Sequence, residues 1–153
     1  MPIDFVFRIL EKLGFGEVFV GWVKTLYNDL ESTLVMNNIL SDFFSIKRSV
    51  RQGCPLSMSL YIIFQEPFYR CVKTSRVIRP LSLPDSSDIN NLGYADDSNV
   101  LILDTQSLIH IIHIIMDFEK ATGCKLNKNK TKIFGVGNYK DRDQWPLNWL
   151  QTE

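Results

Sequence analysis

Apolar residues recur at helical spacing in two stretches at the start of the chain. Residues 3–13 place apolar side chains three and four positions apart, and residues 17–30 repeat this pattern after a break at Gly14-Phe15-Gly16. A period near 3.6 residues is typical of amphipathic helices, and glycine commonly follows a helix end. The pattern predicts two helices joined by a short turn.

The next stretch favours strands and then returns to a helical pattern. Residues 32–36 and 43–50 are rich in β-favourable side chains and predict a β-ribbon with a long loop between its strands. Residues 56–72 have helical apolar spacing after Pro55, a residue that suits the first turn of a helix. Because Pro67 lies inside this segment, we expect a kink or an early end there.

Two apolar runs flank a pair of acidic residues in the second half of the chain. Pro80, Pro84 and the polar residues between Ser82 and Asp88 are turn formers and predict a surface loop. Residues 89–95 and 99–103 then predict the strands of a hairpin whose turn carries Asp96 and Asp97.

A fourth amphipathic helix and a last strand follow the acidic pair. The helix is predicted to extend to Ala121, with Thr105 or Ser107 as its N-cap and Gly123 just beyond its end. Residues 132–136 predict a short strand. From the helix after Pro55 onward the order is helix, strand, strand, helix, strand. This order predicts an α+β fold of the ferredoxin-like type, β-α-β-β-α-β without its first core strand, preceded by the helical pair and the β-ribbon.

Composition is consistent with one globular domain over residues 1–153. The chain is 45% hydrophobic, and Lys plus Arg and Asp plus Glu both number 17, so global charge does not indicate a nucleic-acid binder. Local charge differs, because residues 120–132 contain lysines and no acidic residue, and Lys47, Arg48 and Arg51 form a second basic group. Such runs are usually solvated faces, but two of them beside an acidic turn would suit a polyanion.

Cysteine usage and the N-terminal residues indicate an intracellular protein, in the nucleus or cytoplasm and not secreted. Cys54, Cys71 and Cys124 are odd in number and widely spaced, which argues against a disulfide framework or a zinc site. No stretch is long and apolar enough for a membrane span, and the first residues lack the basic region of a signal peptide. His110 and His113 lack partners at ligand spacing and are interpreted as packing or surface residues.

The acidic pair allows two interpretations. Asp residues are favoured in turns for local reasons, so an Asp-Asp hairpin taken alone is an ordinary solvated turn. Carboxylates held at the tip of a rigid hairpin also suit a hard divalent cation such as Mg²⁺.

Four motifs together resemble the palm of a reverse transcriptase, of the LINE type found in non-LTR retrotransposons. Residues 7–27 resemble the family's helix-Gly-Phe-Gly-helix segment, and Arg51-Gln52-Gly53-Cys54-Pro55-Leu56-Ser57 resembles motif B. Tyr94-Ala95-Asp96-Asp97 resembles motif C, and residues 118–131 resemble motif D. Met58 departs from the proline usual at its position in motif B. The order and spacing of the motifs carry the resemblance, which covers nearly the whole chain.

The resemblance implies RNA-directed DNA synthesis by two-metal nucleotidyl transfer. Its partners would be an RNA template, a DNA primer and deoxynucleotides, with Mg²⁺, or Mn²⁺ in its place, as the cofactor. Asp96 would be the principal catalytic metal ligand and Asp97 its partner. Tyr94 would pack against the primer end, although a tyrosine in a strand is about as often a core residue.

Motifs B and D add candidate nucleotide and template contacts. Gly53 permits close backbone approach, Gln52 offers an amide donor and acceptor, and Arg51 can bind a phosphate. The same loop is also a plausible strand-to-helix connection whose Gly and Pro serve geometry alone. In motif D, Lys125 or Lys130 would stabilise or protonate the leaving pyrophosphate.

The resemblance also implies that the metal site is incomplete within these 153 residues. The family's third carboxylate comes from motif A, upstream of the segment that matches residues 7–16, and Asp4 suits a helix N-terminus better than a metal site. Fingers and thumb are likewise absent, so we expect a partial palm that is inactive alone and self-associates through a bare strand edge. The alternatives are a non-catalytic nucleic-acid-binding module of the same fold and an unrelated α+β domain with a chance Asp-Asp turn.

Overall fold

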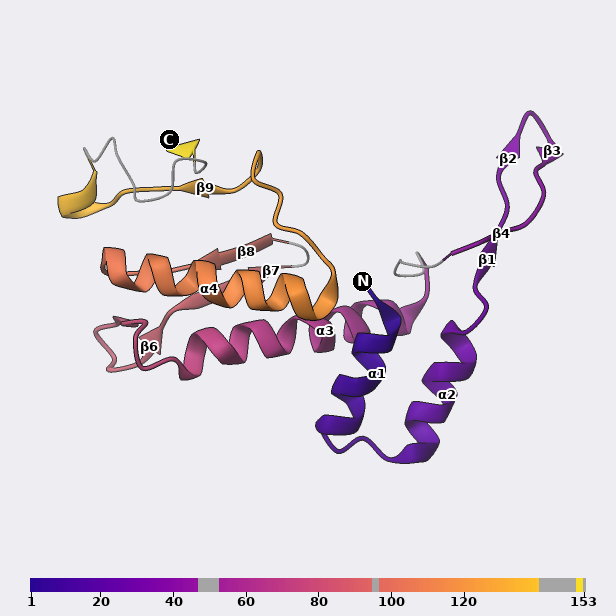
Figure 1. The fold of residues 1–153 in the computed structure, drawn as a ribbon, viewed down its shortest axis with the longest axis horizontal. Helices are drawn as coiled ribbons and strands as arrows, with labels where there is room; N and C mark the ends of the chain where they lie inside the picture. The colour runs from indigo at the N-terminus through magenta and orange to yellow at the C-terminus, as the bar shows by residue number, and fades with distance from the viewer. Residues whose placement is uncertain (47–52, 95–96, 141–150, 153) are drawn as a thin grey trace. The chain divides into compact units, whose positions relative to one another are not determined.

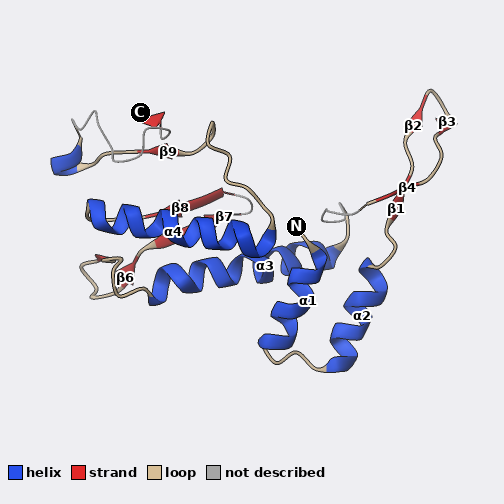
Figure 2. Cartoon of the chain, viewed as in Figure 1, coloured by secondary structure: helices blue, strands red, loops and turns tan. Residues whose placement is uncertain are grey.

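The computed structural model of the chain describes residues 1–46, 53–94, 97–140 and 151–152. Over these residues, helices alternate with short two-stranded sheets (Figures 1 and 2). The chain divides into two compact units, Met1–Pro67 and Phe68–Glu153. The organisation of residues 1–153 as one partial palm domain stays a prediction.

The first unit opens with the predicted helical pair. Helices α1 (Ile3–Lys12) and α2 (Glu17–Tyr27) lie side by side and are joined by a short turn (Figure 1). Gly14 adopts a φ of 81° in this turn, a value that glycine reaches without steric cost. Helix α2 ends three residues before the predicted position because Asn28 is already extended and Asp29 has a positive φ.

The β-ribbon is tighter than the sequence predicts. Strand β1 (Glu31–Ser32) pairs with β4 (Phe44–Ser45), and β2 (Val35–Met36) pairs with β3 (Ile39–Leu40), all antiparallel. The prediction of a long loop after Met36 is therefore wrong, since Ile39 and Leu40 form a strand. Asn37 and Asn38 have φ values of 50° and 66°, and two consecutive left-handed residues make the short hairpin turn that fits the twist of paired strands. The predicted strand residues 47–50 lie outside the described residues.

Helix α3 (Pro55–Thr74) has Pro55 in its first turn, as predicted, begins one residue before Leu56 and passes through Pro67 to Thr74. The expected early end at Pro67 is therefore wrong. Apolar side chains of α3 are buried on both sides of the proline: Leu60 and Phe64 before it and Val72 after it. In the first unit, the ring of Phe64 meets that of Phe5 edge-on, with centroids 5.8 Å apart. Burial of this kind stabilises a helix beyond its intrinsic propensity, which explains how it continues past a proline.

The second unit contains a hairpin over residues 91–100, the acidic hairpin, and two smaller strand pairs. Strand β7 (Asn91–Tyr94) pairs with β8 (Asp97–Val100), so both hairpin strands are shorter than predicted and β8 starts two residues earlier. Strands β5 (Leu81–Ser82) and β6 (Asp88–Ile89) form a small hairpin within the predicted loop. Strand β9 (Lys132–Ile133) pairs in parallel with β10 (Gln151–Thr152).

Within the second unit, one apolar core joins α3, the hairpin of β7 and β8, and helix α4 (Thr105–Thr122). Val72 of α3, Ile78 and Ile111 are buried together, and the partly buried side chains against them include Val100 of β8 and Ile114 and Ile115 of α4. Phe68 of α3 also contacts Phe118 of α4, with ring centroids 5.8 Å apart. The second half of α3, the acidic hairpin and α4 (Thr105–Thr122) are therefore packed against one another.

Helix α4 has the predicted end but a different N-cap. Gly123 takes a left-handed conformation with a φ of 68° at the C-terminus, as predicted. At the N-terminus, Asp104 is the capping residue, because its carboxylate Oδ1 accepts a 2.7 Å hydrogen bond from the Ser107 N–H. The predicted caps, Thr105 and Ser107, lie one and three residues inside the helix.

The observed secondary structure confirms a mixed helix and sheet fold, with small two-stranded sheets that are antiparallel except for β9–β10. The strands of the described residues pair two by two, so the ferredoxin-like order of a palm sheet stays a prediction. Within the described part of the chain, no helix has the length and apolar character that crossing a membrane requires.

Candidate functional site

The register of the acidic hairpin determines which side chains it presents to solvent. Across the two strands, Asn91 faces Val100, Leu92 faces Asn99, Gly93 faces Ser98 and Tyr94 faces Asp97. Successive pairs lie on opposite faces of an antiparallel sheet. Val100 packs on the core, so its face is the inner one and carries the Gly93–Ser98 pair as well. The outer face carries Leu92, Asn99, Tyr94 and Asp97.

Tyr94 and Asp97, two residues of the segment that resembles motif C, lie opposite each other on the outer face of the hairpin. They are cross-strand partners at the last described pair before the connection between the strands. Tyr94 is 84% exposed, and Asp97 is also exposed. The prediction that Asp97 lies in the turn is wrong, because it is the first residue of β8. Asp96 lies outside the described residues.

The inner face of the hairpin is attached to α3 through a tyrosine that the sequence analysis missed. The Tyr69 hydroxyl lies 2.7 Å from Ser98 Oγ, at hydrogen-bond distance. The Tyr69 ring also covers Gly93, because a Cβ added at that glycine would lie 2.7 Å from Tyr69 Cζ. A glycine inside a strand pattern is a signal of close approach by another group, and Gly93 carried that signal.

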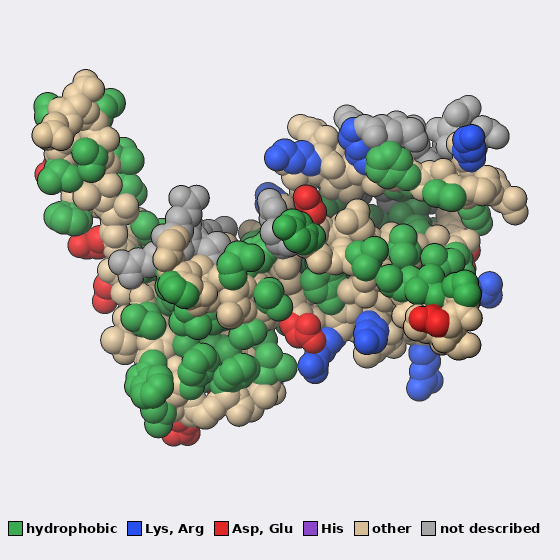
Figure 3. All heavy atoms as spheres, turned by 180° about the vertical axis from the view of Figure 1, so that it is seen from behind, with side chains coloured by type: hydrophobic (Ala, Val, Ile, Leu, Met, Phe, Trp, Pro, Cys, Tyr) green, Lys and Arg blue, Asp and Glu red, His purple; other side chains and the backbone are tan. Residues whose placement is uncertain are grey.

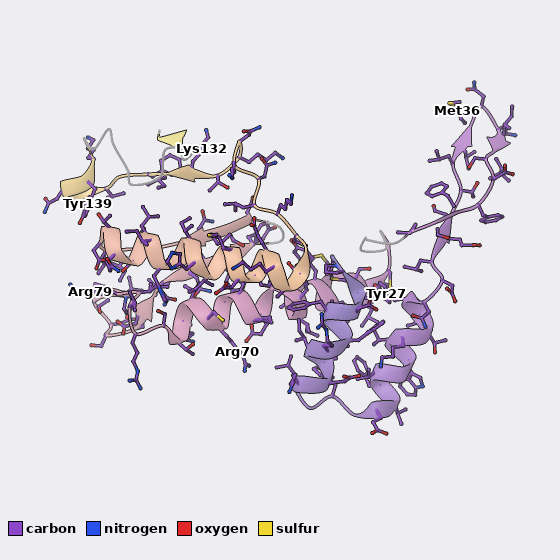
Figure 4. All side chains as sticks on the ribbon, in the orientation of Figure 1. Tyr27, Met36, Arg70, Arg79, Lys132 and Tyr139 are labelled. Carbon is purple, nitrogen blue, oxygen red and sulfur yellow. The ribbon has the colours of Figure 1, made fainter. Side chains whose placement is uncertain are left out.

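The loop that resembles motif B leads directly into α3. Gly53 is exposed and has a φ of 81°, so a residue with a side chain would be strained there. Arg51 and Gln52 lie outside the described residues. The start of α3 is connected to the end of α2 by a 2.9 Å hydrogen bond between the Tyr27 hydroxyl and Ser57 Oγ, and Figure 4 shows Tyr27 at the end of α2. The first turn of α3 also presents backbone N–H groups, which favour an anion.

Cys54 lies immediately before α3 and interacts with the first turn of that helix. A hydrogen bond from the Leu56 N–H is the largest cause that lowers the pKa of the Cys54 thiol from its ordinary value. The Tyr27 hydroxyl, 3.9 Å from the sulfur, acts in the same direction, and partial burial opposes both. The same N–H groups that favour the thiolate make this end of α3 electropositive.

The lysines that resemble motif D project from the segment after α4. Lys125 and Lys130 are exposed, as are Lys128 and Lys132, and Figure 4 shows Lys132 on β9. Glu119 Oε1 accepts a 2.6 Å hydrogen bond from the Leu126 N–H, which ties the start of this segment to α4. A turn follows, in which the Asn127 carbonyl accepts from the N–H groups of Lys130 and Thr131. The segment therefore presents several ammonium groups to solvent from an ordered backbone.

The described side chains alone do not assemble a metal centre. Over residues 1–46, 53–94, 97–140 and 151–152, no three His, Cys, Asp or Glu side chains come close enough to hold an ion. Asp97 offers a carboxylate, the ligand type that Mg²⁺ and Mn²⁺ prefer. The described part of the hairpin therefore supplies one side chain, Asp97, of the ligand type that Mg²⁺ or Mn²⁺ would need.

Comparisons with known proteins agree with the motifs. Residues 1–150 match the model of a family described as reverse transcriptase (RNA-dependent DNA polymerase). The chain is also 34% identical over 122 residues to the Transposon TX1 uncharacterized 149 kDa protein of Xenopus laevis. That match covers 80% of this chain and 8% of the length of the frog protein.

Proposed function

Because the chain belongs to the reverse transcriptase (RNA-dependent DNA polymerase) family, we propose that it forms part of the active site of a LINE-type RNA-directed DNA polymerase. The observation that carries this proposal is the pairing of Tyr94 with Asp97 on the exposed outer face of the β7–β8 hairpin. An exposed carboxylate on a strand that is also anchored to a core can meet a substrate without losing its position. The 34% identity to a transposon protein supports the LINE type.

Asp96 and Asp97 are the proposed metal ligands of motif C. When bound, Mg²⁺ or Mn²⁺ would stabilise the attacking and leaving oxygens of nucleotidyl transfer. Asp97 supplies a charged oxygen from the first position of β8, and Tyr94 opposite it supplies an exposed aromatic ring for the primer end. The two side chains would then hold the primer terminus and the metal on one face of the hairpin.

Motifs B and D would bind the nucleotide and the template. Gly53 leaves the backbone accessible before the electropositive start of α3, where Arg51 and Gln52 would add a guanidinium and an amide. Lys125 or Lys130, both exposed, would bind or protonate the leaving pyrophosphate. These roles come from the family resemblance and agree with the exposure of the described residues.

We further propose a palm arrangement whose third metal ligand is not among these 153 residues. Asp4 is exposed in the first turn of α1, where a carboxylate favours the helix N-terminus, and this position explains it without a metal role. Two carboxylates bind a divalent ion more weakly than three, so the 153-residue polypeptide alone is expected to be inactive.

Primer extension tests the expected inactivity of the chain directly. The purified chain is incubated with poly-rA/oligo-dT, labelled deoxynucleotide and Mg²⁺ or Mn²⁺, beside an Asp97→Asn variant. We expect no incorporation by either protein. Incorporation that disappears in Asp97→Asn would contradict the expectation of inactivity while supporting the polymerase assignment.

A second candidate function is RNA binding without catalysis, favoured by the exposed lysines after α4. Lys125, Lys128, Lys130 and Lys132 would bind phosphates in this case. Replacing two of them with Ala should then reduce the slope of log binding constant against log salt concentration by roughly 0.7 for each phosphate interaction that is removed. Lys12→Ala with Lys73→Ala is the matched control, because both lysines are exposed and lie on other helices. Binding that does not change with salt concentration would exclude this function.

A further inference from the structure

We propose that Tyr69 is a positioning residue, whose side chain on the inner face of the acidic hairpin keeps Asp97 on the outer face oriented for metal binding. The metal part of this inference rests on the proposed function. The contact itself is a property of the second unit, and it involves three residues from separate elements: Tyr69 in α3, Gly93 in β7 and Ser98 in β8.

The contact reaches both strands of the hairpin at the same pair. Tyr69 Oη lies 2.7 Å from Ser98 Oγ, and the end of the same ring covers Gly93, the cross-strand partner of Ser98. One side chain therefore touches both members of a single cross-strand pair. Its neighbours on α3 are fixed as well, because Phe68 and Val72 pack into the core of the second unit.

The position of the contact along the hairpin gives it an effect on Asp97. The Gly93–Ser98 pair is directly adjacent to the Tyr94–Asp97 pair. Adjacent pairs face opposite sides of the sheet, so a contact on the inner face restrains the backbone without covering the outer face. The other inner-face pair, Asn91–Val100, is held by the core through Val100 and lies two pairs further from the acidic end. Tyr69 is thus the described contact to α3 nearest to Asp97.

The need for glycine at position 93 follows from the same contact. The φ of Gly93 is not positive, so its backbone conformation is open to any residue. The constraint is space, since a Cβ at position 93 would lie 2.7 Å from Tyr69 Cζ and closer still to the hydroxyl. An alanine there would force the tyrosine ring away and break its hydrogen bond to Ser98. Gly93→Ala and Tyr69→Phe should therefore have the same effect on the hairpin.

Hydrogen exchange on the full 153-residue chain tests the contact. We expect amides of β7 and β8 to exchange roughly three- to tenfold faster in Tyr69→Phe, Ser98→Ala and Gly93→Ala, the change that removing one ordinary hydrogen bond represents. Amides of α4 should keep the wild-type rate. Ser98→Thr retains a hydroxyl and should restore the protection of the β7 and β8 amides. Tyr61→Phe is the matched control for Tyr69→Phe, because it removes another tyrosine hydroxyl of α3, one that accepts a hydrogen bond from Gln65.

Gly93→Ala combined with Tyr69→Ala separates the contact from a general loss of stability. Removing the ring makes room for the methyl group that Gly93→Ala introduces, so this substitution should cost less in that background than in wild type. Equal effects in both backgrounds, or equal acceleration in β7, β8 and α4, would overturn the proposed contact.

Mn²⁺ titration followed by electron paramagnetic resonance tests the positioning role. We expect Tyr69→Phe and Ser98→Ala to weaken Asp97-dependent Mn²⁺ binding about threefold or more, while Tyr61→Phe and Ser98→Thr leave it unchanged. If the β7 and β8 amides of Tyr69→Phe and Ser98→Ala exchange faster but the Mn²⁺ affinity is unchanged, the positioning role is overturned. A wild-type chain without Asp97-dependent Mn²⁺ binding would instead refute the proposed function, and the exchange rates would still decide whether Tyr69 restrains the hairpin.

Discussion

Asp104 shows how one side chain can define where an element begins. Its carboxylate accepts from the Ser107 N–H at 2.7 Å, and Arg79 Nε lies 3.7 Å from its other oxygen. The Ser107 N–H is the largest cause that lowers the pKa of the Asp104 carboxyl, and the Ser107 hydroxyl and Arg79 act in the same direction against partial burial. The ionised form is therefore more favourable in the folded chain than in the unfolded one.

Replacing this cap should destabilise the second unit in a pH-dependent way. We expect Asp104→Ala to cost about 1 kcal/mol of unfolding free energy at pH 7, and Asp104→Asn to cost less because Asn also caps helices. Since the folded pKa is depressed, the contribution of the charge is complete above the unfolded pKa of about 3.9 and is lost as pH falls through the folded pKa. Urea denaturation at pH 7 and pH 3 measures this. A wild-type advantage over Asp104→Asn that is constant across this range would contradict the assignment.

Residue-level signals in the sequence located the candidate site but not its supporting contact. Tyr94 and Asp97 were identified from motif C, and the structure places them as neighbours. Tyr69 was not identified, because a tyrosine on an amphipathic helix has the same local pattern whether it packs in a core or reaches a distant hairpin. Only the glycine at position 93 is a sequence signal that another group approaches the strand closely, and a glycine does not show which residue that group belongs to.

At the scale of elements, the helices could be predicted and the strand registers could not. Helical periodicity extends over ten or more residues, so α1, α3 and α4 follow from it within a few positions. The strand pairs involve two to four residues each, too few for an alternation to establish a register. The tight turn at Asn37 and Asn38 shows this, because it converts two expected loop residues into strand β3.

The core of the second unit predicts which helix positions matter most. Ile111 is 5% exposed and packs with Val72 and Ile78, so Ile111→Ala should cost about 2–5 kcal/mol because it removes buried apolar area and leaves a cavity. Met116 lies on the same helix and is 47% exposed, so Met116→Ala is the matched control and should cost much less. Thermal or urea unfolding measures both. Equal costs would contradict the observed core.

At the scale of the whole molecule, the chain combines a balanced charge with many exposed apolar side chains. Lys plus Arg and Asp plus Glu both number 17. On the β-ribbon, Met36, Ile39 and Phe43 are each more than 70% exposed, and Figures 3 and 4 show apolar side chains along this ribbon with Met36 at its tip. Balanced charge and exposed apolar surface both favour association between molecules.

We therefore expect the isolated chain to self-associate. Among the described strands, β7 and β8 pair only with each other, so each leaves an edge that could pair with a second copy. Light scattering over a concentration series should show masses above the 17.7 kDa monomer. Adding a charge to the ribbon with Ile39→Lys separates the two sources of association, because it should reduce ribbon contacts and leave the strand edges unchanged. A monodisperse monomer at all concentrations would contradict the expectation.

Asp96 and Asp97 are the proposed metal ligands that this chain would contribute to a reverse transcriptase active site. The most direct test is paramagnetic broadening by Mn²⁺ in the NMR spectrum of the labelled chain. We predict broadening concentrated at Tyr94, Asp97 and Ser98, abolished in Asp96→Asn and in Asp97→Asn, and retained in Asp85→Asn, a carboxylate of the β5–β6 hairpin. Broadening that persists in Asp97→Asn, or that is spread over all acidic residues, would contradict the claim.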